Sequence, residues 1–381
     1  MKKKILILYA TAGIGHKKAA LAIKKAFDEL SMQDIEVTII DSLDYTNGFF
    51  KWTYLKVYLL MVNRLPLLWG ILYYLTDNFY FNLLIARLRR LNNWLNSIRL
   101  ARYLEQSKPR AIISTHFFAT EVVSDLKKAG KLESCLITVV TDYRLHSWWV
   151  SDFVDMYIVG SNDAQDDLSR WGIPSSKIKI LGIPVEPLFS KAQDKKNILR
   201  TMGLKEDAFT TLVIGGGFGV GPIEEIIKSM NNISRTIQII TICGHNEKLV
   251  ERLENLKNTL GPTVIVKTLG FVDNVYDYMS ISDALISKSG GITVAESLAK
   301  ELPMIIISPI LGQETRNSDF LVKHAAAIKI DKPYDLKSLL EDLISHPDRI
   351  ERMKEAIRTI KKPMACYDIA RFAADICNQN P

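Results

Sequence analysis

One stretch of the sequence, residues 283–317, combines residue types that can bind a nucleotide linked to a sugar. A short apolar run stops at Lys288-Ser289-Gly290-Gly291, and apolar residues at helical spacing follow. A strand, a glycine turn and a helix start place free backbone N–H groups and the positive end of a helix dipole at one point, which suits a diphosphate. Glu296 could then reach a ribose, and Gln313 and Glu314 a sugar. The stretch predicts a nucleotide-sugar site, although an ordinary strand–turn–helix connection would also explain Ser-Gly-Gly alone.

A second candidate for chemistry is His16. The sequence Gly13-Ile14-Gly15-His16 follows the first apolar run and opens a helical pattern. The helix dipole disfavours a charged imidazole there, so a neutral ring that accepts a proton is expected. The alternative is a histidine that only caps a surface helix. No third glycine follows at the spacing of a nicotinamide-binding fingerprint.

Other polar residues follow apolar runs, and ligands bind at the carboxyl ends of parallel strands. Asp142 and His146 are therefore acceptor-side candidates, or else belong to a loop with a capping Asp. His245 follows another run that faces the same cleft. The glycine-rich residues 215–221 suit either phosphate contact or a hinge. No Asp-x-Asp sequence occurs, so we expect no metal site and no cofactor beyond the donor substrate.

The whole chain has the size and pattern of two α/β domains. Its 381 residues are 48% hydrophobic, and apolar runs alternate with helical patterns in both halves, which predicts doubly wound parallel sheets. The expected strands are 5–9, 37–40, 111–114, 136–140, 156–159, 212–214, 238–242, 264–269, 284–286 and 304–307. The expected helices include 17–30, 335–345, 347–360 and 365–377. Four cysteines without a C-x-x-C pair indicate reduced thiols in a cytosolic protein.

Residues 49–104 carry the whole net charge of +7. The segment holds eight basic residues, a single acid at Asp77, and 13 of the 34 aromatic residues. This combination is typical of a surface that rests on anionic lipid headgroups, where each basic residue contributes about 1 kcal/mol. The residues that we expect to face the membrane are Trp52, Trp69, Arg87, Arg89 and Arg90. The alternatives are aromatic core residues beneath a solvated arginine face, or a nucleic-acid surface, which the apolar density disfavours.

The segment is not expected to span the bilayer. A spanning helix needs about 20 apolar residues. The best window, residues 54–75, contains Lys56, Asn63, Arg64 and Pro66, and a central arginine costs about 3 kcal/mol. We expect peripheral, monotopic attachment to the cytoplasmic face of the membrane, and no nucleic-acid partner.

Seven motifs occur in the order found in glycosyltransferase family 28. They are GIGHKKAA, TDYRLHSWWV, GIPVEPLF, ICGHN, GFVDN, SKSGGITVAES and PILGQETRN. The chain resembles bacterial processive diacylglycerol glucosyltransferases and plant-type monogalactosyldiacylglycerol synthases over about residues 4–375. This resemblance implies the GT-B fold, two Rossmann-like domains facing across a cleft. Residues 1–186 would form the acceptor and membrane-facing domain, 187–361 the donor domain, and 362–381 would cross back.

The resemblance also implies an inverting transfer of glucose or galactose from UDP-glucose or UDP-galactose to diacylglycerol, with one or more sugars added. His16 takes the position of the general base. The implied donor contacts are Gly217, Phe218, His245, Phe271 and Val272 (uracil, through the backbone of the last two), Ser289, Gly290, Gly291 and Thr293 (diphosphate), Glu296 (ribose), and Gln313 and Glu314 (hexose). The acceptor-side residues are Gly15, Asp142, His146 and Trp148. Phe218 and His245 depart from the residues common in relatives.

Three other activities are compatible with parts of this pattern. The family's peptidoglycan N-acetylglucosaminyltransferases carry a proline shortly after the histidine and His-Gln in the sugar loop, where this chain has Lys17-Lys18-Ala19 and Gly312-Gln313-Glu314. A UDP-sugar 2-epimerase would need no membrane surface. A non-catalytic UDP-sugar sensor would not need His16.

Overall fold

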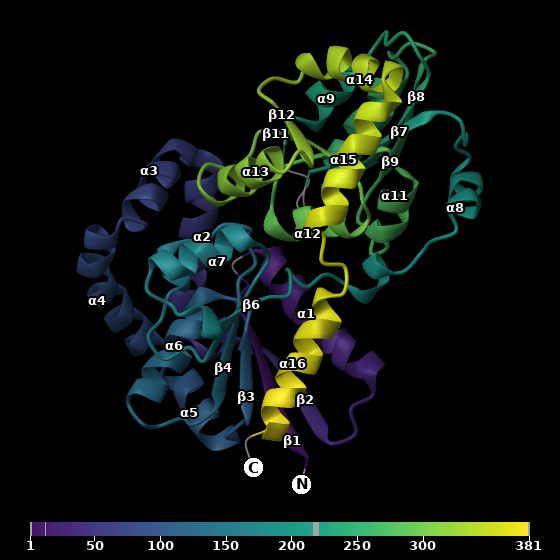
Figure 1. The fold of residues 1–381 in the computed structure, drawn as a ribbon. Helices are drawn as coiled ribbons and strands as arrows, with labels where there is room; N and C mark the ends of the chain where they lie inside the picture. The colour runs from purple at the N-terminus through teal and green to yellow at the C-terminus, as the bar shows by residue number, and fades with distance from the viewer. Residues whose placement is uncertain (1, 12, 216–220, 380–381) are drawn as a thin grey trace. The chain divides into compact units, whose positions relative to one another are not determined.

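The computed structural model describes residues 2–11, 13–215 and 221–379, in two compact units (Figure 1). The first unit comprises Met1–Pro187, Ile310–Asn317 and Lys362–Pro381, and the second comprises Leu188–Pro309 and Ser318–Lys361. The sequence predicts that residues 310–317 belong to the donor domain, 187–361. In the structure these residues cluster with the first unit. Gly217 and Phe218 lie outside the described residues.

The first unit is a parallel sheet in the order β2-β1-β3-β4-β5-β6. Its strands are β1 (Lys3–Tyr9), β2 (Ile35–Asp41), β3 (Ala111–Ser114), β4 (Cys135–Val139), β5 (Met156–Val159) and β6 (Ile178–Ile180). Its helices are α1 (Ile14–Leu30), α2 (Gly48–Arg64), α3 (Pro66–Thr76), α4 (Phe79–Asn96), α5 (Ile98–Ser107), α6 (Phe117–Lys128), α7 (Asn162–Arg170) and α16 (Ala365–Gln379), with 3-10 turns η1 (Ser42–Tyr45), η2 (Ser147–Trp149) and η3 (Ser175–Lys177).

Both faces of the central strands are buried, which explains why β3, β4 and β5 are nearly continuous apolar runs. Side chains alternate along β1, so Ile5 and Ile7 pack in the core that includes α1 and α16. Leu6 and Leu8 pack in the other core, with residues of α5, α6 and α7. The C-terminal helix α16 thus completes the sheet with which the chain begins, and Figure 1 shows it alongside α1.

The second unit repeats the plan with the strand order β12-β11-β10-β7-β8-β9, all parallel. Its strands are β7 (Phe209–Ile214), β8 (Ile237–Ile242), β9 (Val264–Leu269), β10 (Ala284–Ser287), β11 (Met304–Ile307) and β12 (Ala327–Ile330). The other elements are η4 (Pro187–Ser190), α8 (Lys195–Met202), α9 (Ile223–Ser229), α10 (Glu247–Lys257), α11 (Val275–Ile281), α12 (Gly291–Ala299), α13 (Gln313–Lys323), α14 (Asp335–Ser345) and α15 (Pro347–Ile360).

The strand order of each sheet reverses direction once along the chain, as in doubly wound folds. The reversal lies between β1 and β3 in the first sheet and between β7 and β10 in the second. Ligands of such folds bind outside the carboxyl ends of the strands at this point. The two reversals therefore mark where a site is expected in each unit.

Residues 49–104, the segment predicted to face the membrane, contribute to the four helices α2 to α5. Helix α2 ends at Arg64 and α3 begins with Pro66, so the best apolar window is broken where the sequence predicts. Among the described residues, no single helix has the length and hydropathy to cross a membrane. The pair Gly48–Val62 and Pro66–Thr76, bent by 110°, reaches the required length and composition only when taken together.

Candidate functional site

His16 lies at the reversal point of the first sheet. Gly13, with φ 121°, turns the chain from β1 into α1 in a conformation that side chains disfavour, and His16 follows in the first helical turn. The Nδ1 atom of His16 is 2.7 Å from the Thr115 carbonyl oxygen, just beyond the end of β3. A carbonyl can only accept, so Nδ1 carries the proton and donates it, and Nε2 of the neutral ring is an acceptor.

Burial keeps the His16 ring neutral. It lowers the pKa of His16 from 6.5 to about 4, against the opposing effect of the hydrogen bond to Thr115. The Oγ1 atom of Thr141, beyond the end of β4, is 3.1 Å from the same Nδ1, and the Thr115 hydroxyl donates to the His16 carbonyl at 3.0 Å. Two neighbouring strands therefore fix the tautomer and the orientation of one imidazole, which can accept a proton at Nε2.

A second histidine, His116, packs against His16. Their rings lie 4.5 Å apart with an interplanar angle of 76°. The Nδ1 atom of His116 accepts a hydrogen bond from the Phe118 backbone N–H at 3.1 Å, which caps α6. Burial and the nearby His16 hold the pKa of His116 well below its usual range. The His116 ring is therefore neutral where it packs against His16. The Trp149 ring also packs near His16, with the two ring centroids 6.0 Å apart.

His146, predicted as an acceptor-side residue, has both ring nitrogens in hydrogen bonds within the first unit. Its Nδ1 atom accepts from the Trp148 backbone N–H at 3.2 Å, and its Nε2 atom donates to the Tyr73 carbonyl at 2.9 Å. Burial lowers the pKa of His146 to about 4. With both ring nitrogens engaged, the ring fastens the loop after β4 to helix α3. The Trp148 ring packs at 4.5 Å on His146 and at 5.3 Å on Phe117.

Two other predicted acceptor-side residues, Gly15 and Asp142, are sequence neighbours of residues in the His16 site. Gly15 occupies the first turn of α1, one residue before His16. Asp142 follows Thr141, which contacts the His16 ring. The Asp142 carboxylate accepts a hydrogen bond from Asn317 at 3.0 Å, and burial raises its pKa. Asp142 thus holds the 310–317 segment, a contact that the sequence interpretation did not anticipate.

Two further side chains bind the 310–317 segment to the rest of the first unit. The Asn317 amide oxygen accepts from the Tyr143 backbone N–H at 2.9 Å. Arg316 donates to the Leu145 carbonyl at 2.7 Å and to the Asp77 carboxylate, and its guanidinium lies 5.2 Å from the centre of the Tyr73 ring. Sequence reasoning missed both roles. The sequence feature that could have indicated the role of Arg316 is Asp77, the one acidic residue in segment 49–104, which also holds eight basic residues.

The predicted hexose residues belong to this same segment. Gln313 is the first residue of α13. The Glu314 carboxylate accepts a hydrogen bond from the Ile310 backbone N–H at 2.7 Å, so it stabilises the turn that precedes the helix. Gly312, at φ 97°, leaves room for the Tyr73 ring, which an added Cβ would meet at 2.7 Å. Arg316, Asn317 and Tyr73 therefore position Gln313 and Glu314.

In the second unit the serine–glycine turn joins β10 to α12 at the reversal point. Helix α12 begins at Gly291 with Gly290 as its cap, and none of the described side chains caps it by a hydrogen bond. Its first backbone N–H groups and its positive dipole end can therefore hold a diphosphate. Ser289 is buried at the turn, Thr293 lies in the first helical turn, and Glu296 is buried one turn further on.

Two aromatic rings meet just after the carboxyl ends of the neighbouring strands β8 and β9 of the same sheet. The rings of His245 and Phe271 stack with centroids 4.4 Å apart and an interplanar angle of 10°. The Phe271 side chain is 61% exposed, and Val272 follows it partly buried. The structure thus brings both predicted uracil positions and His245 to the same edge of the sheet. Among the described residues, no group of three or more His, Cys, Asp or Glu side chains could hold a metal ion.

The predicted membrane-facing residues have different environments. Trp52 is 57% exposed, and the Lys56 ammonium lies 5.7 Å from the centre of its ring. The Trp69 ring packs on that of Trp148, with the two ring centroids 6.3 Å apart. The side chain of Arg87 lies outside the described residues.

Arg89 is not a membrane-facing cation. Its Nε atom donates to the Glu121 carboxylate at 3.0 Å, and the two side chains are only 18% and 3% exposed. Arg90 lies 3.9 Å from the same carboxylate and 3.6 Å from that of Asp152. Burial raises the pKa of Glu121, and Arg89 opposes this. These two arginines join α4 to α6, which explains part of the basic charge of the segment.

Two family models match the chain. The model of monogalactosyldiacylglycerol (MGDG) synthase matches residues 16–185, and that of the glycosyltransferase family 28 C-terminal domain matches residues 210–369. The processive diacylglycerol beta-glucosyltransferase of Bacillus pumilus is 29% identical over 363 residues, 94% of this chain and 91% of that protein. The protein of the same name from Bacillus cereus (strain G9842) is 27% identical over 366 residues, with 94% and 90% covered.

Solved structures share the fold at low sequence identity. MurG of Acinetobacter baumannii has a TM-score of 0.67 and 14% identity, over 98% of this chain and 99% of its own. MnaA of S. aureus, solved with UDP, has a TM-score of 0.60 and 14% identity, over 100% and 99%. These similarities and the two doubly wound parallel sheets confirm the predicted GT-B fold class.

Proposed function

Because the chain belongs to glycosyltransferase family 28, we propose that it transfers glucose or galactose from a UDP-sugar to the free hydroxyl of diacylglycerol. The transfer inverts the anomeric centre and gives a β-linked glycolipid. The observation that carries this proposal is the His16 ring, whose Nδ1–H is bonded to the Thr115 carbonyl and whose low pKa leaves Nε2 ready to accept a proton. The names of the relatives support diacylglycerol as the acceptor.

The proposed reaction is a single displacement. The acceptor oxygen attacks the anomeric carbon while its proton passes to Nε2 of His16. The bond between the anomeric carbon and the diphosphate oxygen breaks, and UDP leaves with the electron pair. The uncapped start of α12 stabilises the negative charge that develops on the leaving diphosphate. No step requires a metal ion, so we propose that the enzyme works without one.

A test of the proton acceptor is the variant His16→Ala. We expect purified His16→Ala to lose about 10²–10⁴-fold in glycolipid formation while binding UDP as the parent protein does. Near-normal turnover by folded His16→Ala would contradict the assignment. The variant His346→Ala is the matched control, since His346 is an exposed residue of the second unit, and it should keep full activity.

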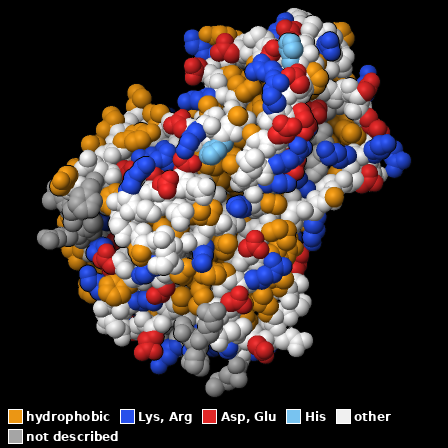
Figure 2. Space-filling model, in the orientation of Figure 1, with side chains coloured by type: hydrophobic (Ala, Val, Ile, Leu, Met, Phe, Trp, Pro, Cys, Tyr) orange, Lys and Arg blue, Asp and Glu red, His pale blue; other side chains and the backbone are white. Residues whose placement is uncertain are grey.

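We also propose that helices α2 to α4 attach the protein peripherally to the cytoplasmic face of the membrane. Large apolar side chains along them are strongly exposed, among them Phe49 (76%), Trp52 (57%), Leu88 (68%) and Trp94 (60%). Figure 2 shows hydrophobic side chains gathered where Figure 1 places α3. Exposed apolar surface of this extent supports contact with lipid, the medium in which diacylglycerol resides.

A further inference from the structure

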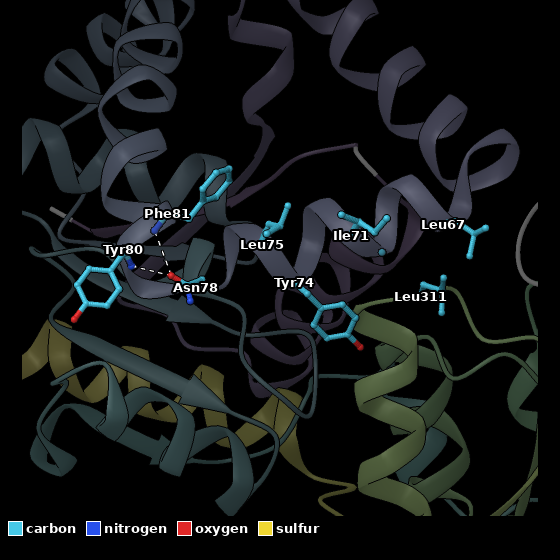
Figure 3. Close-up of a pocket in the computed structure, with 9 residues that line it drawn as sticks. Leu67, Ile71, Tyr74, Leu75, Asn78, Tyr80, Phe81 and Leu311 are labelled. Atoms are coloured by element: carbon cyan, nitrogen blue, oxygen red, sulfur yellow. Dashed lines mark hydrogen bonds between the residues drawn. The ribbon is translucent and has the colours of Figure 1, made fainter.

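A groove on the first unit follows helix α3. It has a volume of about 1010 Å³, and its walls include Ile71, Tyr74 and Leu75 from α3, Phe81 from α4, and Leu311 from the 310–317 segment. In Figure 3 the labelled side chains extend from Tyr80 and Phe81, near one end of α3, to Leu67 and Leu311 at the other. The groove is therefore elongated, and the 11 residues of α3 give it a length of about 16 Å.

The chemistry of the groove suits a hydrocarbon chain. None of the described residues that line it carries a charge. The Asn78 amide oxygen is already used, because it accepts from the backbone N–H groups of Tyr80 and Phe81 at the start of α4. An extended peptide in the groove would need hydrogen-bond partners for its backbone, which an acyl chain does not.

The groove is continuous with the apolar surface proposed to contact the membrane. Leu67 and Ile71 at its rim are 74% and 58% exposed, and Tyr80 is 81% exposed. Tyrosines beside exposed leucines are typical of the boundary between hydrocarbon and water. A lipid chain could thus enter the groove sideways from the bilayer without crossing a polar surface.

One end of the groove is lined by Leu311, from the segment that holds the predicted hexose residues. Gly70 has no side chain, which lets Leu311 lie so close that an added Cβ would be 2.9 Å from the Leu311 Cβ. Leu311 precedes Gln313 by two residues, and both belong to the first unit. A chain lying in the groove would therefore have one end beside the residues assigned to the sugar.

We propose that this groove binds one acyl chain of the lipid acceptor, with the glycerol end toward Leu311. The proposed function supplies the identity of the lipid as diacylglycerol. The binding of a hydrocarbon chain rests on the groove alone.

The first test measures how transfer depends on acyl length. Diacylglycerols of increasing chain length, supplied as monomers dissolved in water without vesicles, should become better acceptors by up to about fourfold per methylene until the groove is filled. Ile71→Trp places a large ring in the groove and should reduce the preference for long chains at least tenfold. The matched control is Leu72→Trp on the neighbouring face of α3, where the parent side chain is 39% exposed and does not line the groove, and it should keep the preference. Equal length dependence in Ile71→Trp and Leu72→Trp would overturn the proposal.

The second test needs no sugar transfer. A diacylglycerol with a diazirine at the end of one acyl chain is photolysed with the protein in phosphatidylcholine vesicles, and labelled peptides are identified by mass spectrometry. We expect labelling within residues 67–81 that excess unlabelled diacylglycerol competes away and that Ile71→Trp reduces at least fivefold relative to Leu72→Trp. Labelling spread evenly over α2 and α4 without competition would refute the groove. Specific labelling without any glycolipid product would refute the proposed function and leave the groove standing.

Discussion

His16 shows how local structure can set the chemistry of one ring. Its Nδ1–H is held by the Thr115 carbonyl, and burial lowers the pKa to about 4. Protonation of Nε2 removes the proposed base, so kcat/KM should fall as the pH drops through about 4 and stay level from about 5 to 8. A pH profile of transfer from a UDP-sugar checks this. An acid limb centred near 6.5, the ordinary pKa of histidine, would show that the ring is solvated when it reacts.

Arg89 provides a test of a buried ion pair at the same scale. Removing its guanidinium in Arg89→Ala leaves the buried Glu121 carboxylate with Asn93, which donates at 3.1 Å, as its closest remaining partner. We expect a loss of about 1–3 kcal/mol in the free energy of unfolding, measured by urea denaturation.

The control for that loss is Arg99→Ala on the exposed face of α5, which should change the free energy of unfolding by less than about 0.5 kcal/mol. Vesicle binding by Arg89→Ala should match that of the parent protein. Weaker vesicle binding with unchanged stability would restore Arg89 as a membrane-facing residue.

Single residues also show where sequence reasoning ends. The glycine turn before His16 and the serine–glycine turn before α12 could be predicted, because each depends on a few consecutive residues. The pairing of Asp77 with Arg316 could not, since 239 positions separate them in the sequence. His146 illustrates the same limit, because its partner Tyr73 becomes visible only when α3 is packed against the loop after β4.

At the scale of elements, the end of α3 positions the 310–317 segment. Asp77 accepts from Arg316 and, through its other oxygen, from the Ser147 backbone N–H at 2.7 Å. We expect Arg316→Met to speed hydrogen exchange of residues 310–317 and to raise KM for the UDP-sugar about 5–30-fold, equivalent to about 1–2 kcal/mol.

The control for this positioning role is a double-mutant cycle. Asp77→Asn should have a similar effect, and the double variant should be little worse than either single variant, because both changes break one interaction. Additive effects on KM would mean that the two residues act separately. Unchanged exchange in residues 310–317 would mean that neither holds the segment.

The helices α2 and α4 carry the membrane prediction. Trp52 and Trp94 are more than half exposed, and burying a large apolar side chain contributes about 1.5–3 kcal/mol. In a vesicle flotation assay, Trp52→Glu with Trp94→Glu should weaken binding at least tenfold, whereas Tyr334→Glu, equally exposed on the second unit, should not. Binding should also be stronger to anionic than to neutral vesicles at low salt. Equal loss with Tyr334→Glu would show that the effect is not specific to these helices.

Across the whole molecule, the pattern of apolar runs predicted most of the two sheets. Strands such as β3, β5 and β11 are buried on both faces, so their sequences are nearly continuous apolar runs with clear ends. The strands that sequence reasoning missed, β6 and β12, are the edge strands Ile-Lys-Ile and Ala-Ile-Lys-Ile. A lysine interrupts each short run, because one side of an edge strand meets solvent.

The central claim is that the whole molecule makes a β-linked glycolipid from a UDP-sugar and diacylglycerol. The most direct measurement incubates purified protein with diacylglycerol vesicles, a chelator, and either UDP-glucose or UDP-galactose. Mass spectrometry and NMR of the extracted lipid then give the sugar and the anomer. We expect a β-hexosyl-diacylglycerol from at least one donor, released UDP in equal amount, and about 10²–10⁴-fold less product from His16→Ala. An α-linked product, or transfer only of N-acetylglucosamine to another lipid, would contradict the account.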